Sequence, residues 1–128
     1  MIGVHAYIDV GDLDQGIAFY CDGLGLSVRR RLSPRWVELQ GALVPVFLLA
    51  RTKPPGSFAR HWTPVHLDFI VEDIDRTVAN LTAHGATLEG EIQAREYGRI
   101  AYMADPFGNG FDVIAFSGEG YEGVARND

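Results

Sequence analysis

The chain has 128 residues, a length typical of one domain, and 47% of them are apolar while 22% are charged. This composition excludes a disordered chain, a collagen-like repeat and a coiled coil. Seventeen acidic and eleven basic side chains give a net charge of -6, so no nucleic-acid partner is expected.

The sequence pattern of the first half of the chain predicts one strand, a helix and three further strands. Apolar residues alternate over positions 4–10, which is typical of a strand with one buried face. Asp12 is a good N-cap for a following helix, and Gly23 and Gly25 can end that helix in the left-handed conformation. The later strands are predicted over about 26–33, 35–40 and 43–50.

The second half repeats this order after a predicted linker, residues 51–64, that contains Pro54 and Pro55. Asp73 is the N-cap of a second helix, which Gly85 can end. The strands are predicted over 65–71, 87–95, 98–104 and 110–116. Residues 118–128 contain few large apolar side chains, and we predict a flexible tail there.

An internal repeat supports this organisation, because a shift of 61 residues superimposes residues 5–14 on residues 66–75. The identical pairs are His5/His66, Val10/Val71, Asp12/Asp73 and Asp14/Asp75. The sequence therefore predicts two tandem βαβββ modules, about 2–50 and 65–117.

The cellular setting is predicted from the cysteine content and from the apolar segments. Cys21 is the single cysteine, so it has no internal disulfide partner, and we expect a packed thiol. The N-terminal residues lack the basic and apolar regions of a secretion signal. The uncharged run at 41–50 is shorter than the roughly 20 residues of a membrane span. A cytoplasmic protein without a membrane segment is expected.

Polar side chains on the strands suggest a metal site. Alternation places His5 and Tyr7 on the polar face of the first module, and His66 and Asp68 on the corresponding face of the second. Asp112 lies on the polar face of the last strand. Two imidazoles and one carboxylate form a set that binds divalent metals with open positions. A purely structural role for each histidine is the alternative, and the repetition of His5 at position 66 favours the metal.

These residues, together with a later turn, resemble the vicinal oxygen chelate superfamily, which includes glyoxalase I, fosfomycin and bleomycin resistance proteins and extradiol dioxygenases. The resemblance covers about residues 2–117. It is carried by His5-x4-Val10-x-Asp12-Leu13-Asp14-x2-Ile17-x-Phe19-Tyr20-x3-Leu24-Gly25-Leu26 and by Asp105-Pro106-Phe107-Gly108-Asn109-x2-Asp112.

The resemblance implies an α+β fold in which two tandem βαβββ modules curl round a shared cavity within one domain, residues 1–117, often in a homodimer. It implies that His5, His66 and Asp112 bind a divalent cation, which would be Fe, Mn, Ni or Zn. Asp112 is one methylene shorter than the Glu that is usual there. Phe47 falls where glyoxalase I-like members have a ligand Glu, which argues against glyoxalase I proper.

Other side chains are candidates for the substrate pocket and for catalysis. The predicted pocket residues are Tyr7, Trp36, Phe47, Asp68, Arg99 and Tyr102. The candidate catalytic residues are Glu38, His61 and Tyr102. Ordinary exposed side chains are the alternative for the charged ones, and Glu38 is expected to be exposed on its strand. The run Arg29–Arg31 is predicted to be a solvated strand end with no function beyond a rim.

Two functions from different classes follow from the resemblance. The first is a metal-dependent lyase, isomerase or extradiol-type dioxygenase that acts on a small substrate with vicinal oxygens. The alternative is a metal-free protein that sequesters a drug or metabolite, as in the bleomycin resistance proteins. Position 47 favours the second function, and the paired histidines favour the first. A purely structural dimerisation domain is a third hypothesis.

Overall fold

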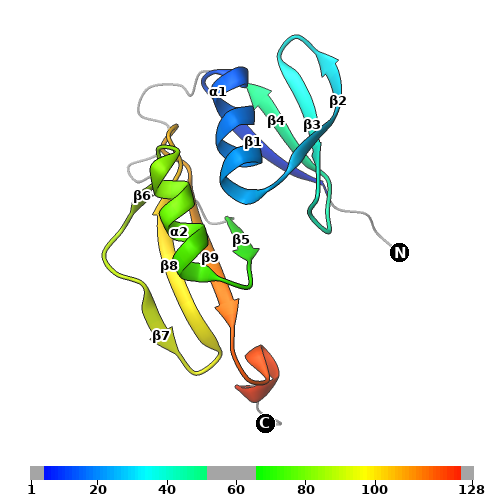
Figure 1. Ribbon diagram of the computed structural model, residues 1–128. Helices are drawn as coiled ribbons and strands as arrows, with labels where there is room; N and C mark the ends of the chain where they lie inside the picture. The colour runs from blue at the N-terminus through cyan, green and yellow to red at the C-terminus, as the bar shows by residue number, and fades with distance from the viewer. Residues whose placement is uncertain (1–4, 52–65, 125–128) are drawn as a thin grey trace. The chain divides into compact units, whose positions relative to one another are not determined.

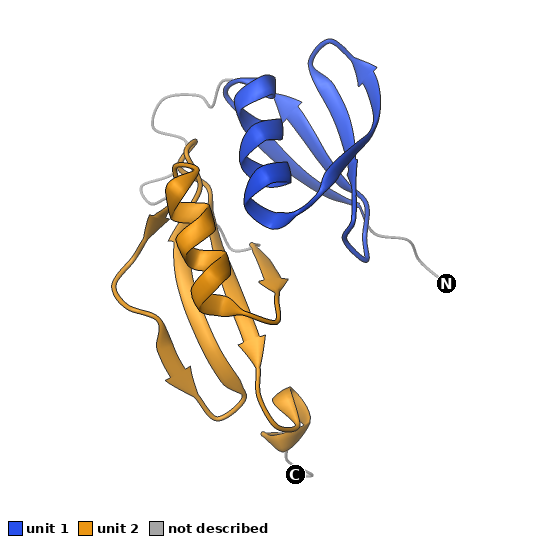
Figure 2. Ribbon diagram, viewed as in Figure 1, with its two compact units in different colours: residues 1–57 blue, residues 58–128 orange. Residues whose placement is uncertain are grey.

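The computed structural model describes residues 5–51 and 66–124. Within these limits the chain is α+β and divides into two compact units, residues 1–57 and residues 58–128 (Figure 2). The boundary falls within the predicted linker. The catalytic candidate His61 lies outside the described residues. No helix of the described part is long and apolar enough to cross a membrane.

Unit 1 contains a four-stranded sheet with its helical segment on one face (Figure 1). The strand order is β1-β4-β3-β2, in which β1 and β4 are parallel and the other pairs antiparallel. Its elements are β1 (Ala6–Val10), α1 (Leu13–Ile17), the π-helical turn η1 (Ala18–Asp22), β2 (Ser27–Ser33), β3 (Trp36–Gln40) and β4 (Val46–Ala50).

Unit 2 repeats this topology in a five-stranded sheet. The order is β5-β9-β8-β6, β7 also pairs with β8, and β5 and β9 are parallel. Its elements are β5 (Leu67–Ile70), α2 (Ile74–Ala83), β6 (Thr87–Leu88), β7 (Gln93–Arg95), β8 (Gly98–Ala104), β9 (Gly110–Phe116) and the 3-10 turn η2 (Gly120–Gly123). The prediction of two βαβββ modules is confirmed.

The predicted helix caps are present in both units. Asp12 Oδ1 accepts a hydrogen bond from the backbone N–H of Gln15 at 2.8 Å, and Asp73 Oδ1 accepts one from Arg76 at 3.1 Å. Each bond satisfies an N–H group that the helix itself leaves unpaired. The two helices therefore begin where the sequence predicts.

One face of each sheet packs against its helix. In β1 the residues Ala6, Ile8 and Val10 are buried, and in α2 the buried residues Ile74, Val78 and Leu81 recur at helical spacing. The alternate residues of β1 therefore point away from the helix, as the sequence pattern predicts.

Two segments differ from the prediction. The strand expected over 87–95 consists of the two short strands β6 and β7, because Gly90 between them has a φ of 81°. The predicted flexible tail is folded at its beginning: η2 follows β9, and the Tyr121 ring lies 4.7 Å from that of Phe116. Ring packing thus holds the described part of this segment against the end of the sheet.

Gly98 begins β8 with a φ of 145°, and a Cβ atom there would collide with the carbonyl oxygen of Ala115. We expect Gly98→Ala to lower the free energy of unfolding by more than about 2 kcal/mol, because backbone strain and overpacking add. Gly90→Ala is the control, since φ is also positive there but nothing lies within 4 Å, and it should cost about 1 kcal/mol. Urea unfolding measures both, and equal losses would contradict the collision.

Candidate metal centre

The strand register of unit 2 brings together three side chains of types that can bind a metal ion. β5 and β9 are parallel, with Asp68 directly beside Asp112. His66 lies two residues before Asp68, so its side chain emerges on the same side. The helix covers the other face, where Phe69 and Phe111 pack edge to face with centroids 5.6 Å apart.

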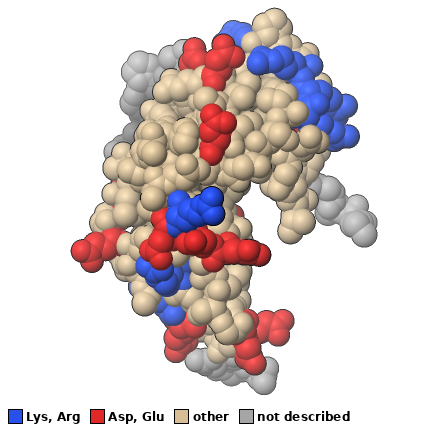
Figure 3. All heavy atoms as spheres, viewed as in Figure 1, with Lys and Arg blue, Asp and Glu red and all other residues tan. Residues whose placement is uncertain are grey.

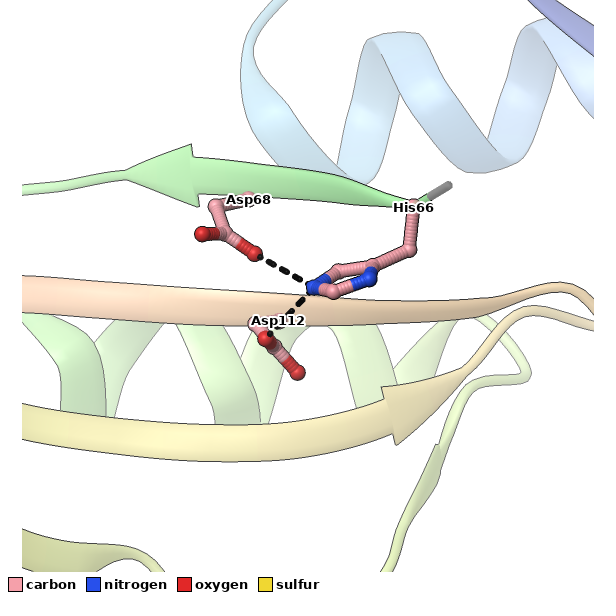
Figure 4. A group of neighbouring side chains, drawn as sticks. All are labelled: His66, Asp68 and Asp112. Atoms are coloured by element: carbon pink, nitrogen blue, oxygen red, sulfur yellow. Dashed lines mark ion pairs between the residues drawn. The ribbon is translucent and has the colours of Figure 1, made fainter. Parts of the chain in front are cut away.

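The three side chains converge on the imidazole (Figure 4). His66 Nε2 lies 3.3 Å from Asp68 Oδ1 and 3.3 Å from Asp112 Oδ2. One possible ligand atom from each residue falls within a group whose members are all within 4.8 Å of one another. Two of the predicted metal ligands, His66 and Asp112, are therefore neighbours, and Asp68 joins them.

Asp112 is the buried member of the group. Its side chain is 8% exposed, whereas those of Asp68 and His66 are 38% and 39% exposed. Burial, the largest factor, and the adjacent Asp68 together raise the pKa of Asp112 to about 6, while His66 acts in the opposite direction. The Oδ1 atom of Asp112 is buried and has no hydrogen-bond partner in the part of the chain that the structure describes.

A divalent cation fits this donor set. Atoms bonded to one metal at about 2.1 Å are about 3.0–3.4 Å apart at octahedral or tetrahedral angles, and the two His66 contacts have this length. A positive ion would also compensate two adjacent carboxylates, one of which is buried. The unpaired Oδ1 of Asp112 offers a further donor atom. One imidazole with two carboxylates matches the ligands of Fe, Mn, Ni and Zn.

Unit 1 has aromatic rings at the corresponding positions. Tyr7 is directly beside Phe47 in the β1–β4 register, as Asp68 is beside Asp112 in unit 2. The ring centroids of Tyr7 and Phe47 are 4.8 Å apart with an interplanar angle of 8°. The His5 ring lies 4.9 Å from Phe47. Phe47 therefore occupies the position in unit 1 that corresponds to Asp112 in unit 2, and His5 as a ligand stays a prediction.

The environment of Glu38 differs from the one that the sequence predicts. It is 2% exposed, so the prediction of an exposed strand residue is wrong. Arg30 Nε donates to Glu38 Oε1 at 2.7 Å and Arg29 NH1 donates to Oε2 at 2.8 Å. The Arg30 hydrogen bond is the largest factor that lowers the pKa of Glu38 below its usual value. A carboxylate held in this way is a poor general base, which does not fit the catalytic role.

The other predicted pocket residues fall on both faces of their sheets. Tyr102 is directly opposite Asp112 across β8 and β9, so it lies on the same face as Asp112. Arg99 lies on the other face, where NH1 donates to Asp75 of α2 at 2.7 Å, which does not fit a role beside Asp112. Trp36 shares the face of Glu38, and its indole N–H is buried without a partner among the described residues.

Sequence reasoning missed two features of these sites. Asp68 was expected as a pocket residue, but its place beside His66 on an alternating strand already contained the signal for a ligand. The link from Arg29 and Arg30 to Glu38 was not expected, because cross-strand pairing sets it. The register shift of β2 between Val28 and Arg30 helps two adjacent arginines to reach one carboxylate.

Comparison with known proteins identifies the family. A model of the glyoxalase-like domain matches residues 5–114. The chain belongs to the glyoxalase-like family. The anthracycline biosynthesis protein DnrV from Streptomyces peucetius is 31% identical over 115 residues, which cover 84% of this chain and 38% of DnrV. This member of the family therefore spans less than half the length of that relative.

Solved structures of the glyoxalase/bleomycin resistance/dioxygenase group share the fold. The fosfomycin resistance protein FosX from Listeria monocytogenes matches with a TM-score of 0.75 and 19% identity over 98% of this chain and 100% of FosX. A family enzyme from Burkholderia phytofirmans PsJN matches with a TM-score of 0.70 and 20% identity over 88% of this chain and 97% of that chain. The resemblance stated from the sequence motifs is confirmed.

The raised pKa of Asp112 predicts a pH-dependent stability of the metal-free protein. The folded carboxylate prefers its proton, so the stability that Asp112 contributes is greatest at low pH and is lost as the pH rises from about 4 to about 6. Asp112→Asn does not titrate there. In EDTA, the variant should gain about 1–3 kcal/mol relative to the wild type between pH 4 and pH 8. Urea unfolding at both pH values measures this, and a pH-independent difference would contradict it.

Proposed function

We propose that this member of the glyoxalase-like family is an enzyme of small-molecule metabolism that binds a divalent cation through His66, Asp68 and Asp112. The convergence of these three side chains, with the unpaired buried oxygen of Asp112, is the observation that supports it. Similarity to a protein of anthracycline biosynthesis supports small-molecule metabolism. A cation at this site would supply Lewis-acid chemistry to a substrate with two neighbouring oxygen atoms.

Each polar side chain at this site of unit 2 has a separate role in the proposed function. Asp112 Oδ2 and Asp68 Oδ1 each lie 3.3 Å from His66 Nε2, and these three atoms would be the donors to the cation. The roughly two-fifths exposure of His66 and Asp68 leaves room for a substrate oxygen to approach. Tyr102, opposite Asp112, is half-buried, and its phenolic O–H can donate a hydrogen bond to an oxygen that gains negative charge. Lyase, isomerase or dioxygenase chemistry fits such a site.

A metal-free binding protein is the second candidate, and the aromatic residues of unit 1 favour it. Tyr7, Phe47 and His5 form one contacting group where a carboxylate ligand would otherwise stand. Stacked rings are suited to a planar compound rather than to a cation donor set. This function predicts ligand affinity without metal.

Metal binding separates the two candidates. We expect the protein, purified without an affinity metal and stripped with a chelator, to bind one Mn(II), Ni(II) or Zn(II) per chain in isothermal titration calorimetry. His66→Ala should weaken this affinity more than about 100-fold, because it removes the central donor. His84→Ala is the matched control: its imidazole lies at the end of α2, where Nδ1 is 2.8 Å from the backbone oxygen of Asn80.

The control should bind metal as the wild type does. If the wild type binds no metal, including Fe(II) under anaerobic conditions, the metal proposal is wrong and the binding protein is favoured. If His66→Ala and His84→Ala lose affinity equally, the ion binds elsewhere. Circular dichroism of both variants establishes that the fold is intact.

A further inference from the structure

A groove runs along unit 2 between the beginning of α2 and the adjacent end of the sheet. Its volume is about 560 Å³, and small-molecule sites typically have about 300–1,000 Å³. Arg99 and Ala115 line the groove and are directly paired across β8 and β9. Arg99 lies on the face that α2 covers, whereas Asp112 lies on the opposite face. The groove is therefore separate from the candidate metal centre.

Small side chains leave this space open. The registers place Ala94 of β7 beside Arg99 of β8, and Arg99 beside Ala115 of β9. Directly paired residues of neighbouring strands point to the same face, so the Arg99 side chain emerges between two methyl groups. Gly98, which also lines the groove, has no side chain. A longer side chain at position 94 would therefore occupy the groove.

A completed ion pair forms the wall of the groove at α2. Arg99 NH1 donates to Asp75 Oδ2 at 2.7 Å, and NH2 donates to Oδ1 at 3.0 Å. Two parallel hydrogen bonds of this kind fix the plane of the guanidinium group and match its charge with that of the carboxylate. The remaining charged side chains of the groove therefore determine which ligand it fits.

Glu72 and Arg95 line the same groove with opposite charges. Neither forms a salt bridge with another described residue. Arg95 instead donates to neutral oxygens, from NH1 to the backbone oxygen of Ala94 at 3.0 Å and from NH2 to Gln93 Oε1 at 2.7 Å. A guanidinium group has five N–H donors, so further donors stay available. Figure 3 shows basic and acidic side chains side by side over the part of unit 2 where Figure 1 draws the beginning of α2.

These charges favour a ligand that carries both signs. The carboxylates of Glu72 and Asp73, which are adjacent in the sequence, can accept hydrogen bonds from an ammonium group. Arg95 can donate to a carboxylate. An anion alone would leave Glu72 without a partner, and a cation alone would leave Arg95 without one. A zwitterion pairs with both residues.

An aromatic ring offers a surface for the apolar part of such a ligand. Phe116 lines the groove and is 40% exposed. Its ring is held by two others, since the centroid of Tyr121 lies 4.7 Å away and that of Tyr97 lies 6.4 Å away, at interplanar angles of 70° and 72°. An exposed ring that is fixed in this way can pack against an apolar or aromatic side chain of the ligand.

We propose that this groove binds a zwitterionic amino acid with an aromatic or other apolar side chain. Its ammonium group lies on Glu72, its carboxylate on Arg95 and its side chain against Phe116. The proposal goes beyond the metal function and does not depend on it, because the groove is on the other face of the sheet. An amino acid can also chelate a metal ion, so the experiments are done in EDTA, and a failure of metal binding leaves them unaffected.

Three probes with the same phenyl ring test the charge requirement. L-Phenylalanine carries both charges at neutral pH, 2-phenylethylamine lacks the carboxylate, and 3-phenylpropanoate lacks the ammonium group. We expect the wild-type protein to bind L-phenylalanine about fivefold more tightly than either other probe, because each of those leaves one exposed charge of the groove unpaired. An NMR titration of the backbone amide signals measures the three affinities, and the signals of Gly98, Arg99 and Ser117 should shift.

Three variants assign the roles. Glu72→Gln should weaken the binding of L-phenylalanine and 2-phenylethylamine about fivefold and leave that of 3-phenylpropanoate unchanged, since only the first two carry the ammonium group. Arg95→Gln should weaken the binding of L-phenylalanine and 3-phenylpropanoate by a similar factor and leave that of 2-phenylethylamine unchanged. Ala94→Leu should weaken the binding of all three probes, because the longer side chain fills the groove.

Glu91→Gln and Arg76→Gln are the matched controls. Each removes the same charge as one of the test variants, but from a residue that does not line the groove. Neither control should change the affinity for any probe. All the substituted residues are exposed, and the amide spectrum of each variant establishes that its fold is intact.

Four results would overturn the proposal. The first is an equal affinity of the three probes for the wild type. The second is an equal loss of all probes in both Glu72→Gln and Arg95→Gln, and the third is binding that Ala94→Leu leaves unchanged. The fourth is the absence of shifts in the groove signals at about 20 mM L-phenylalanine, since a site of millimolar affinity would then be mostly occupied.

Discussion

The parallel pairing of the first and last strands is the constraint on which both units depend. β1 pairs with β4 and β5 with β9, and each pair brings residues from the two ends of a module side by side. Parallel neighbours need a long crossover, which the helix and the intervening strands provide. A slip of one residue would turn Asp112 toward the helix-covered face and a core residue toward solvent. Burial of that core face therefore fixes the position of the polar side chains.

One scaffold supports opposite electrostatic environments in its two copies. Glu38 and Asp112 are both buried carboxylates on the face away from the helix. Two guanidinium groups lower the pKa of Glu38, whereas burial and the neighbouring Asp68 raise that of Asp112. The difference follows from the partners, since hydrogen bonds from a cation stabilise the ionised form and desolvation opposes it.

Much of the fold was predictable because local signals agreed with each other. Asp12 and Asp73 cap the helices where expected, and the 61-residue repeat predicted equivalent strands. Alternation predicted a polar face in unit 2, and His66, Asp68 and Asp112 lie together on it. The prediction that Glu38 is exposed was wrong because its environment depends on arginines from another strand. The local sequence pattern contains no information on that pairing. Arg99 lies on the face opposite to Tyr102 because the two residues are three positions apart on β8, and its contact with Asp75 is non-local.

The contrast between the two carboxylates explains why they have different roles. A buried carboxylate that accepts hydrogen bonds from two arginines, as Glu38 does, has its desolvation cost offset by them and orients its partners. A buried carboxylate beside a second carboxylate, with one oxygen unpaired, is costly in the absence of a positive ligand. Such a free-energy cost is typical of a ligand-binding site, because the binding energy of the ligand offsets it. The two units therefore use the same face of the sheet differently: unit 2 presents an incomplete donor set, and unit 1 presents a completed ion pair beside a stack of rings.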